Sequence, residues 1–455
     1  MGRRGRVDKT FKAAAVAGLL AAGVFAVVPG QALAADAKPG LPSEMAGYSY
    51  LTGNVTSAPP GRAVALWQYG FGVEFMDFPQ AVVLGASSDV YRRLDVAEGR
   101  HGAETQGDPG PMLLSPDGTK AAVGHYDIDP PDLAVVDLAT GDVTTHPLPE
   151  GHSVIPLAWS PDSTRLAYGA STGPDNPYSG DPRWPVGSRL SVVDTTSGAV
   201  TKLPVTDYAA VAFAPIGTDV AVETPGSIRV LDATGAERRR LPLPAERHLA
   251  GPSAWSPDGR LLAITRPMTT CFDPADYVDP TGLVQDCDPS TDGLSFVDAT
   301  GTGAAVPRPL KGDLSGTRDV LGWTSPTEVV VLDDLTAPTS PDFTDQKHWV
   351  TAVSVDGQQS RRLMSVPDDG NYGVGRFHLA SALAPDLEVR PAGSADRGTW
   401  PTVVRIGAIA AALGLLVSYA RSAWRGRQRA RRRAAYRAAR LAAADTVAGH
   451  PASAP

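Results

Sequence analysis

The sequence lacks most features that mark enzymes and mainly helical proteins. It has two cysteines in 455 residues, and none of its eight histidines shows the pair spacing of a helical zinc motif. Helical periodicity is missing until near the C-terminus, which argues against a mainly helical fold. Glycine (47) and proline (41) are instead frequent and scattered between short apolar runs. This pattern predicts many short strands and an all-β fold.

Positive charge is scarce in the body of the chain and concentrated at its two ends. Residues 1–34 carry a net charge of +4 and residues 405–455 a net charge of +9. Because the whole chain has a net charge of −8, residues 35–404 carry a net charge of −21. An acidic body repels nucleic acid and anionic lipid, so no nucleic-acid partner is predicted. The basic ends are interpreted as membrane-topology signals.

The N-terminus has the organisation of a secretory signal peptide. Within residues 1–34 a basic stretch precedes an apolar run, and residues 32–34 (ALA) match a small-residue cleavage site. We expect cleavage before Ala35, and the alternative is an uncleaved N-terminal anchor. Arg3-Arg4 resembles a twin-arginine signal, but Arg6 takes the place of an apolar residue. General secretion is therefore preferred.

A second apolar segment, residues 399–420, has the length of one membrane-spanning helix. Nine arginines follow it between residues 421 and 440, and such a cluster belongs on the cytoplasmic side. We therefore predict a single-pass protein of the cell membrane, with its body outside and the basic tail, residues 421–455, in the cytoplasm. The alternative is a helix buried in the protein core.

The body contains an internal repeat. Each repeat unit begins with a segment, here called its first line, which joins two apolar runs through a tight turn with the order Ser-Pro-Asp-Gly or a close variant. Serine, proline and glycine stand where a type I turn favours them, so each line predicts a β-hairpin. The copies occupy residues 111–124, 156–169, 210–223 and 252–265, with a weaker copy at 319–332.

A second segment, the second line of the unit, follows each first line. Its pattern predicts a strand, a turn with the order Asp-x-x-x-Gly or a shorter one, and another strand. These lines occupy residues 132–148, 189–205, 227–243, 294–310 and 351–366. Two hairpins make a four-stranded unit, which cannot bury both faces alone and must stack on its neighbours. Radial stacking of such units predicts a β-propeller, with the apolar first strands at the centre and the last strands outside.

Six blades are favoured over seven. A partial unit with three strands occupies residues 62–98, and an orphan strand follows the last repeat at 375–386. That strand would complete the first blade and remove the open edge of the ring. The predicted organisation is an N-terminal extension (35–61), the propeller (62–386) and a linker (387–398) before the membrane helix.

With these motifs in view, the chain resembles the TolB-like and WD-repeat-like bacterial β-propellers. The turns at 115–118, 160–163 and 256–259 and the Val-Asp-x-x-x-Gly hairpins carry the resemblance, over roughly residues 62–386. Residues 214–217 and 324–327 depart from the turn pattern. The resemblance implies the propeller fold. It also implies a role among binding platforms, periplasmic adaptors, sensors and occasional enzymes.

Few motifs point to chemistry, and no catalytic residue, cofactor or metal site is predicted. Residues 169–173 match G-x-S-x-G, but the proline-rich stretch that follows cannot form the helix of a nucleophile elbow. His125 and His152 are candidates for one end of the propeller or for plain surface residues. Cys271 and Cys287 are predicted to form a disulfide, as expected for two nearby cysteines in an oxidising compartment.

Three long loops, 171–188, 266–293 and 333–348, join the second and third strands of their blades and so fall on one face of the ring. They hold five aromatic residues, which either contact a partner or pack the loops down: Tyr178, Trp184, Phe272, Tyr277 and Phe343. The acidic segment 271–292 is a conceivable calcium site, although a solvated loop is favoured.

Three functions are compatible with these features. The first is a membrane-anchored extracytoplasmic propeller that binds or scaffolds an envelope protein. The second is a propeller enzyme, a hydrolase or lyase, with its site in the central channel. The third is an envelope sensor that signals through its helix. The first is preferred because the predicted inner strands are poor in His, Asp and Glu.

Overall fold

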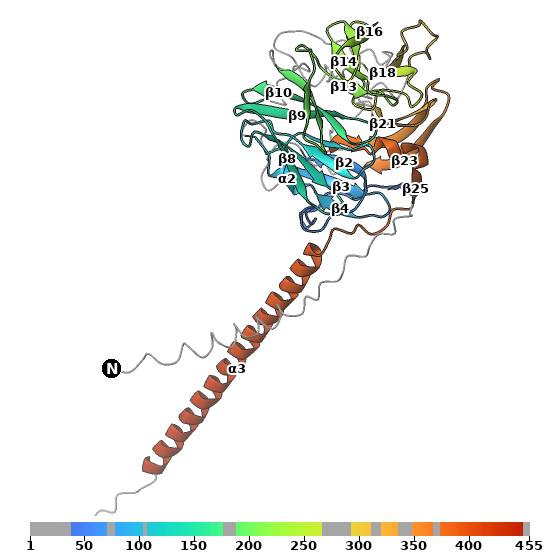
Figure 1. Cartoon of the computed structure of the whole chain (residues 1–455). Coiled ribbons are helices and arrows are strands. Elements are labelled where there is room, and N and C mark those ends of the chain that lie inside the picture. Colours follow the sequence, from blue (N-terminus) through green and yellow to red (C-terminus); the bar gives the residue numbers. More distant parts are fainter. Residues whose placement is uncertain are drawn as a thin grey trace, which may run out of the picture. The chain divides into compact units, whose positions relative to one another are not determined.

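The protein forms a six-bladed β-propeller, followed in the chain by one long helix (Figure 1). The computed structural model describes residues 38–70, 78–102, 107–175, 188–265, 293–310, 320–334, 348–366 and 374–448. Within these ranges six antiparallel sheets follow one another along the chain, and each sheet is one blade. The predicted all-β class and the number of blades are confirmed.

Blades 1 to 3 contain four strands each, ordered from the centre of the ring outward. Blade 1 consists of β24 (Val374–Leu379), β2 (Ala63–Tyr69), β3 (Gln80–Gly85) and β4 (Tyr91–Arg93), after which α2 (Asp95–Glu98) forms one turn of helix. Blade 2 consists of β5 (Met112–Leu114), β6 (Lys120–Val123), β7 (Asp132–Asp137) and β8 (Val143–Pro147). Blade 3 consists of β9 (His152–Trp159), β10 (Arg165–Thr172), β11 (Arg189–Asp194) and β12 (Val200–Lys202).

Blades 4 to 6 complete the ring. Blade 4 consists of β13 (Val211–Phe213), β14 (Val220–Thr224), β15 (Ser227–Leu231) and β16 (Glu237–Pro242). Blade 5 consists of β17 (His248–Leu249), β18 (Leu261–Thr265) and β19 (Leu294–Asp298). Blade 6 consists of β20 (Val320–Ser325), β21 (Glu328–Asp334), β22 (His348–Ser354) and β23 (Ser360–Val366).

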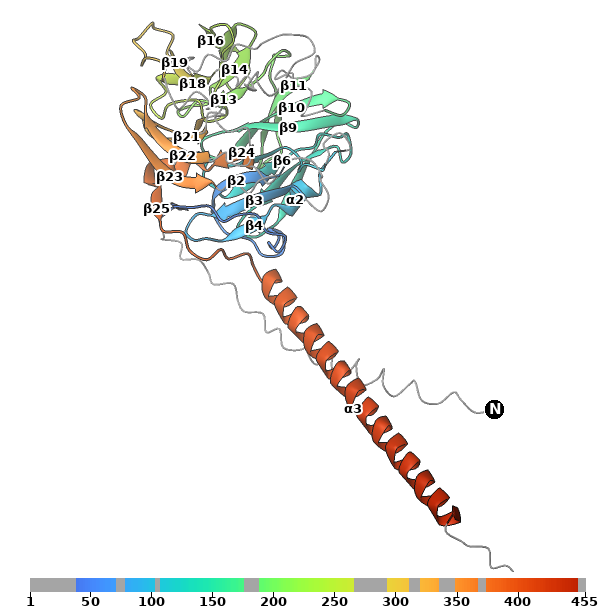
Figure 2. The ribbon, with the colours of Figure 1, turned by 180° about the vertical axis from the view of Figure 1, so that it is seen from behind.

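The ring closes in blade 1, where the first and last parts of the propeller meet. β24 pairs antiparallel with β2, with Ala65 opposite Leu379 and Tyr69 opposite Val374. β24 also contacts the inner strands of blades 2 and 6, and the view from behind shows it between β21 and β6 (Figure 2). The orphan strand predicted from the sequence therefore supplies the missing inner strand of the first blade.

Adjacent blades share their apolar cores. One cluster joins β13–β16 to blades 5 and 6, and another joins the strands of blades 3 and 4. The largest cluster joins blades 1, 2 and 6 around Trp67, whose ring stacks on Phe377 at 6.0 Å between centroids. Each sheet thus buries its faces against its two neighbours, as the repeat argument requires.

Blade 5 departs from the prediction because its fourth strand does not form. The repeat pattern predicts that residues 303–310 pair with β19, but they have no regular strand. Only Leu310 N–H donates to Leu294 O, at 2.8 Å. Pro307 and Pro309 have no N–H to donate, which leaves this segment short of ladder hydrogen bonds.

The C-terminal helix α3 (Trp400–Ala448) is long and apolar enough to cross a membrane over its first half. The helix does not end at Ala420, where the apolar segment stops, but continues through the arginine-rich stretch. Alanine and arginine dominate this stretch, and both are strong helix formers.

Candidate binding site in the central channel

The candidate site is a cavity that all six blades line. Its walls come from the inner strands and from the turns that end them, so the cavity is one end of the central channel. It encloses about 210 Å³. Pockets for drug-sized ligands usually enclose ~300–1,000 Å³. We call this end of the channel the mouth.

The Ser-Pro-Asp-Gly turns build the rim of the mouth. In the first turn Gly118 N–H donates to Ser115 O at 2.9 Å, which closes the predicted turn, and Gly118 has φ +71°. The Ser115 hydroxyl donates to Asp117 at 2.7 Å and accepts from Lys120 N–H at 2.9 Å. The other two turns repeat these bonds at residues 160–165 and 256–261. The rim is thus rigid because each side chain bonds its own turn.

The rim aspartates are held as carboxylates. Partial burial opposes the ionisation of Asp117, but hydrogen bonds from Thr119, Ser115 and Ser163 outweigh that effect and lower its pKa. Hydrogen bonds from Ser160 and Thr164 likewise lower the pKa of Asp162 against its partial burial. These carboxylates accept hydrogen bonds from residues of their own turns.

A ring of apolar side chains lines the mouth just inside the rim. At or near the end of its inner strand, each blade carries a large apolar residue with at most 6% exposure: Leu114, Trp159, Phe213, Trp255, Trp323 and Leu379. The sequence pattern contained part of this signal, since four of these residues stand at one position of the aligned repeat: Leu114, Trp159, Phe213 and Trp255. Trp323 is shifted by one position in the weaker copy, and Leu379 lies in the orphan strand. Sequence reasoning used the apolar inner strands as evidence for the centre of the propeller and against catalysis, and it missed the ring.

The three ring tryptophans also fasten neighbouring blades. Trp159 Nε1 donates to Leu113 O of blade 2 at 3.2 Å, and Trp255 Nε1 donates to Ala212 O of blade 4 at 3.2 Å. Trp323 Nε1 donates to Ser253 O of blade 5 at 3.0 Å. Each buried indole N–H is therefore satisfied, and its ring is free to present only apolar surface.

His378 is the one ionisable residue among the described residues that line the mouth. Burial among apolar groups lowers its pKa to about 4, and the nearby Arg376 acts in the same direction. The imidazole is therefore neutral at neutral pH. Inside the aspartate-bearing rim the walls of the mouth are uncharged and offer prolines and aromatic rings to a ligand, among them Pro116, Pro161, Pro215 and Pro257.

The opposite end of the channel is charged. Arg376, on the closing strand β24, has φ +49°, donates to Pro109 O at 3.2 Å and lies 3.9 Å from the carboxylate of the buried Asp108. Its guanidinium also stands 5.3 Å from the centre of the Tyr126 ring. Burial raises the pKa of that tyrosine. These groups are paired with one another.

The two candidate histidines do not form a site. His125 is 3% exposed, exchanges backbone hydrogen bonds with Val154, and accepts from Asp127 N–H through Nδ1 at 3.0 Å. Burial lowers its pKa, and Arg100 adds to the effect. His152 begins β9, and its Nδ1 lies 3.1 Å from Glu150 O. Neither side chain points to a shared ligand.

The G-x-S-x-G match lies in a β-strand. Ser171 is part of β10, which pairs with strands on both sides, and its Oγ lies 2.8 Å from Ser153 Oγ. Its hydroxyl is therefore partnered inside a sheet. Among the residues that the structure describes, no group of three or more His, Cys, Asp or Glu side chains could hold a metal ion.

A polar contact between blades 4 and 5 lies beside a second cavity. The buried Glu223 accepts from Leu249 N–H at 2.7 Å and lies 2.7 Å from His248 Nδ1. Glu223 belongs to β14 of blade 4, and both of its partners belong to β17 of blade 5. We interpret the Glu223 carboxylate as a contact that holds blades 4 and 5 together.

Several predicted features fall outside the described residues. They are Cys271 and Cys287 with their disulfide, the acidic segment 271–292, and the loop aromatics Tyr178, Trp184, Phe272, Tyr277 and Phe343. The disulfide therefore stays a prediction.

Comparison with known proteins finds solved structures that the chain resembles at low sequence identity. No family model and no curated protein matches the chain. Solved structures that it resembles include TolB from Acinetobacter baumannii (14% identity, 71% of this chain and 68% of that one, TM-score 0.42). A putative TolB from Agrobacterium tumefaciens (16% identity, 70% and 99%, TM-score 0.36) is another. Oligogalacturonate lyase from Vibrio parahaemolyticus (13% identity, 70% and 77%, TM-score 0.40) is a third. At these values the likeness concerns the fold alone.

Proposed function

We propose that this protein is a membrane-anchored binding propeller, exported and held outside the cell by α3, which captures an apolar segment of an envelope protein in the channel mouth. The observation that carries the proposal is the composition of the mouth, where six blades present aromatic and proline side chains around an uncharged cavity. Aromatic anchors in desolvated pockets dominate the binding energy of protein interfaces.

The mouth, at about 210 Å³, is smaller than the pockets that usually enclose drug-sized ligands, and its apolar lining suits apolar side chains of a protein partner. A partner would insert such side chains as anchors, and the rim turns would contact the residues around them. The tryptophan rings are held by their Nε1 bonds, so little conformational freedom is lost on binding.

The signal-peptide and topology predictions give the proposal its place in the cell. Residues 1–34 have the features of an export signal, and the arginines after Ala420 favour a cytoplasmic C-terminus. The helix itself has the length and composition of a membrane span. A partner would then be met on the outer side of the cytoplasmic membrane.

The alternative of a propeller enzyme has less support. A hydrolase or lyase needs an available acid or base near its substrate. Among the described residues His378 is the one titratable group that lines the mouth, and the described groups of the charged end already bond one another. The sensor alternative has no feature of its own in the described residues.

The proposal is tested by photo-crosslinking in intact cells. A photoreactive amino acid replaces Pro161 or Ser253 at the mouth, and Val200 on the outer strand β12 serves as the control. We expect one discrete adduct from the two mouth positions and none from position 200. Pro257→Glu should remove the adduct, whereas Pro257→Ser should keep it. Equal adducts at all three positions, or none at the mouth, would contradict the proposal.

A further inference from the structure

The two segments that flank the propeller are docked onto it side by side. β1 (Gly40–Pro42) pairs parallel with β25 (Glu388–Arg390), which lies in the stretch predicted as a linker. Further bridges join Asn54 to Arg93 and Val90 to Asp396 on the outer strand of blade 1. The chain therefore stays attached to the propeller almost until α3 begins.

Arg397 fixes the N-terminal segment to the last residues before the helix. Its guanidinium donates to Thr52 Oγ1 at 2.9 Å and to Gly47 O, and it stands 5.6 Å from the centre of the Tyr91 ring. Its carbonyl accepts from Gly53 N–H at 2.9 Å. The turn of residues 47–53 is thus bound at both ends to residue 397.

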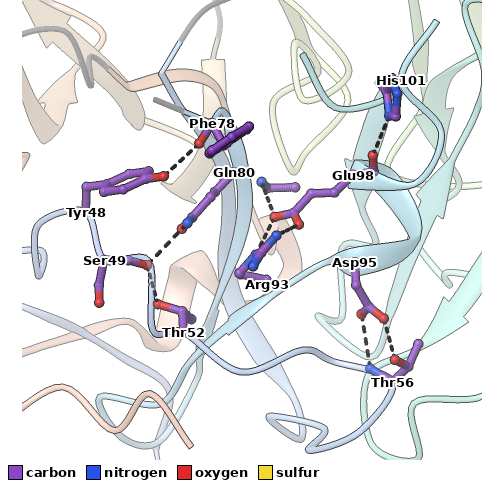
Figure 3. A network of polar contacts seen from close by, with 11 residues as sticks. Tyr48, Ser49, Thr52, Thr56, Phe78, Gln80, Arg93, Asp95, Glu98 and His101 are labelled. Carbon is purple, nitrogen blue, oxygen red and sulfur yellow. Dashed lines mark hydrogen bonds and ion pairs between the residues drawn. The ribbon is translucent and has the colours of Figure 1, made fainter. Parts of the chain in front are cut away.

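Three aromatic side chains lie on or beside that turn, and we call them the aromatic patch: the half-buried Tyr48 and the exposed Tyr50 and Phe78. Tyr48 donates its hydroxyl to Phe78 O at 2.8 Å (Figure 3). Its ring lies 5.0 Å from that of Tyr50. Gln80 donates to Ser49 O at 3.2 Å and holds the same turn (Figure 3). Tyr50 is 48% exposed and Phe78 is 58% exposed. Two large apolar rings therefore face outward from a firmly held backbone.

Chain length places this patch close to the membrane surface. α3 begins at Trp400, three residues after Arg397, and three residues of extended chain reach at most ~10 Å. The apolar stretch 401–420, which ends where the arginine run begins at Arg421, is ~30 Å long as a helix and matches the hydrocarbon core. Trp400 then lies at the outer boundary of the bilayer, and residues 47–53 lie within the reach of its headgroups.

We propose that the aromatic patch inserts into the outer headgroup layer of the same membrane that α3 spans. Tyrosine and other amphipathic aromatic side chains prefer this layer. The inference rests on the membrane anchoring proposed above. It gives the propeller a second attachment beside its helix, so that the propeller keeps one fixed orientation on the bilayer.

Lipid quenching of site-specific labels tests this inference. The full-length protein is reconstituted into nanodiscs of phosphatidylcholine and phosphatidylglycerol that contain a lipid spin-labelled at its headgroup. A fluorophore is attached to Tyr50→Cys or Phe78→Cys, and the unmodified parent gives the labelling background. The matched control is Ile216→Cys, which is 73% exposed in blade 4, across the ring from blade 1.

We expect at least threefold stronger quenching at positions 50 and 78 than at position 216. Quenching at 50 and 78 no stronger than at 216 would overturn the inference. Gly414→Cys, inside the apolar part of α3, reports the anchor separately through a lipid spin-labelled in its acyl chain. Quenching there without quenching at 50 and 78 contradicts the patch alone, whereas no quenching at 414 contradicts the anchoring itself.

Discussion

The two ends of the channel are built by different means. Each blade contributes to the mouth one large apolar residue from the end of its inner strand. The other end uses residues outside the repeat, such as Asp108 and Tyr126, and one inner-strand residue with positive φ, Arg376. One end is regular and apolar inside its rim, whereas the other is irregular and charged.

This difference shows how a repeat distributes structure and function. Residues at a repeated position must satisfy the same packing in each blade, and the ring tryptophans do so while they line a cavity. Irregular residues are under no such constraint and satisfy one another locally. We therefore assign binding to the regular end and local stabilisation to the charged end.

The largest expected effect comes from opening the regular end. Trp255→Ala removes a buried indole and its bond to Ala212 O, and should lower the free energy of unfolding by about 3–5 kcal/mol. Trp255→Phe keeps most of the packing and should lose about 1 kcal/mol for the hydrogen bond. Denaturant titration of the full-length protein in detergent measures both. Similar losses for the two variants would show that the ring packs less tightly than described.

A smaller effect is expected at the charged end. Asp108→Asn removes the buried carboxylate that faces Arg376 and should cost about 1–3 kcal/mol of stability. Because this end is assigned to stabilisation, the mouth adduct of the crosslinking experiment should persist. Loss of the adduct in a folded Asp108→Asn protein would move the binding site to the charged end.

The stability of the protein should depend on pH through groups of the mouth. The pKa of His378 falls to about 4 in the folded protein, below its unfolded value near 6.5. The unfolded chain therefore takes up a proton first, and stability present above pH 6.5 is lost as the pH falls toward 4. His378→Gln should reduce the fall of the melting temperature over this range, and His125 and His146, whose pKa values burial also lowers, should keep part of it. The rim aspartates have lowered pKa values and contribute their own loss only below about pH 4.

The smallest effect is expected on the rim itself. Pro161→Ser leaves the bond between Ser163 N–H and Ser160 O in place and should cost only about 0.4–1 kcal/mol, mainly through a freer unfolded chain. The variant should melt within a few degrees of the parent in a thermal scan. A larger loss would mean that the rim depends on proline for its fold. A charged substitution of a rim proline, such as Pro257→Glu, would then have to be compared with the serine variant at the same position.

The sequence predicts the scaffold well because its signals are local and repeated. The Ser-Pro-Asp-Gly turns, the alternation of hairpins and the orphan strand before Ala380 determine the blades and the ring closure. The missing fourth strand of blade 5 depends on Pro307 and Pro309 in a segment whose apolar pattern still resembles a strand. The prediction weighed the pattern above the missing N–H groups.

The site was less predictable because it depends on distant contacts. The mouth tryptophans are visible in the repeat, but their Nε1 bonds cross from one blade to the next. The docking of Arg397 on Gly47 and Thr52 joins residues about 350 positions apart, and no local pattern indicates it. Composition alone suggested a plain linker there.

Fluorine NMR of the ring tryptophans tests the central assignment most directly. The full-length protein is labelled with 5-fluorotryptophan, its signals are assigned through single Trp→Phe variants, and the crosslinked partner is added in purified form. The account predicts shifts for Trp159, Trp255 and Trp323, with Trp67 and Trp349 unchanged as internal controls. Shifts confined to Trp67 or Trp349, with the three ring signals unmoved by a bound partner, would contradict binding at the mouth.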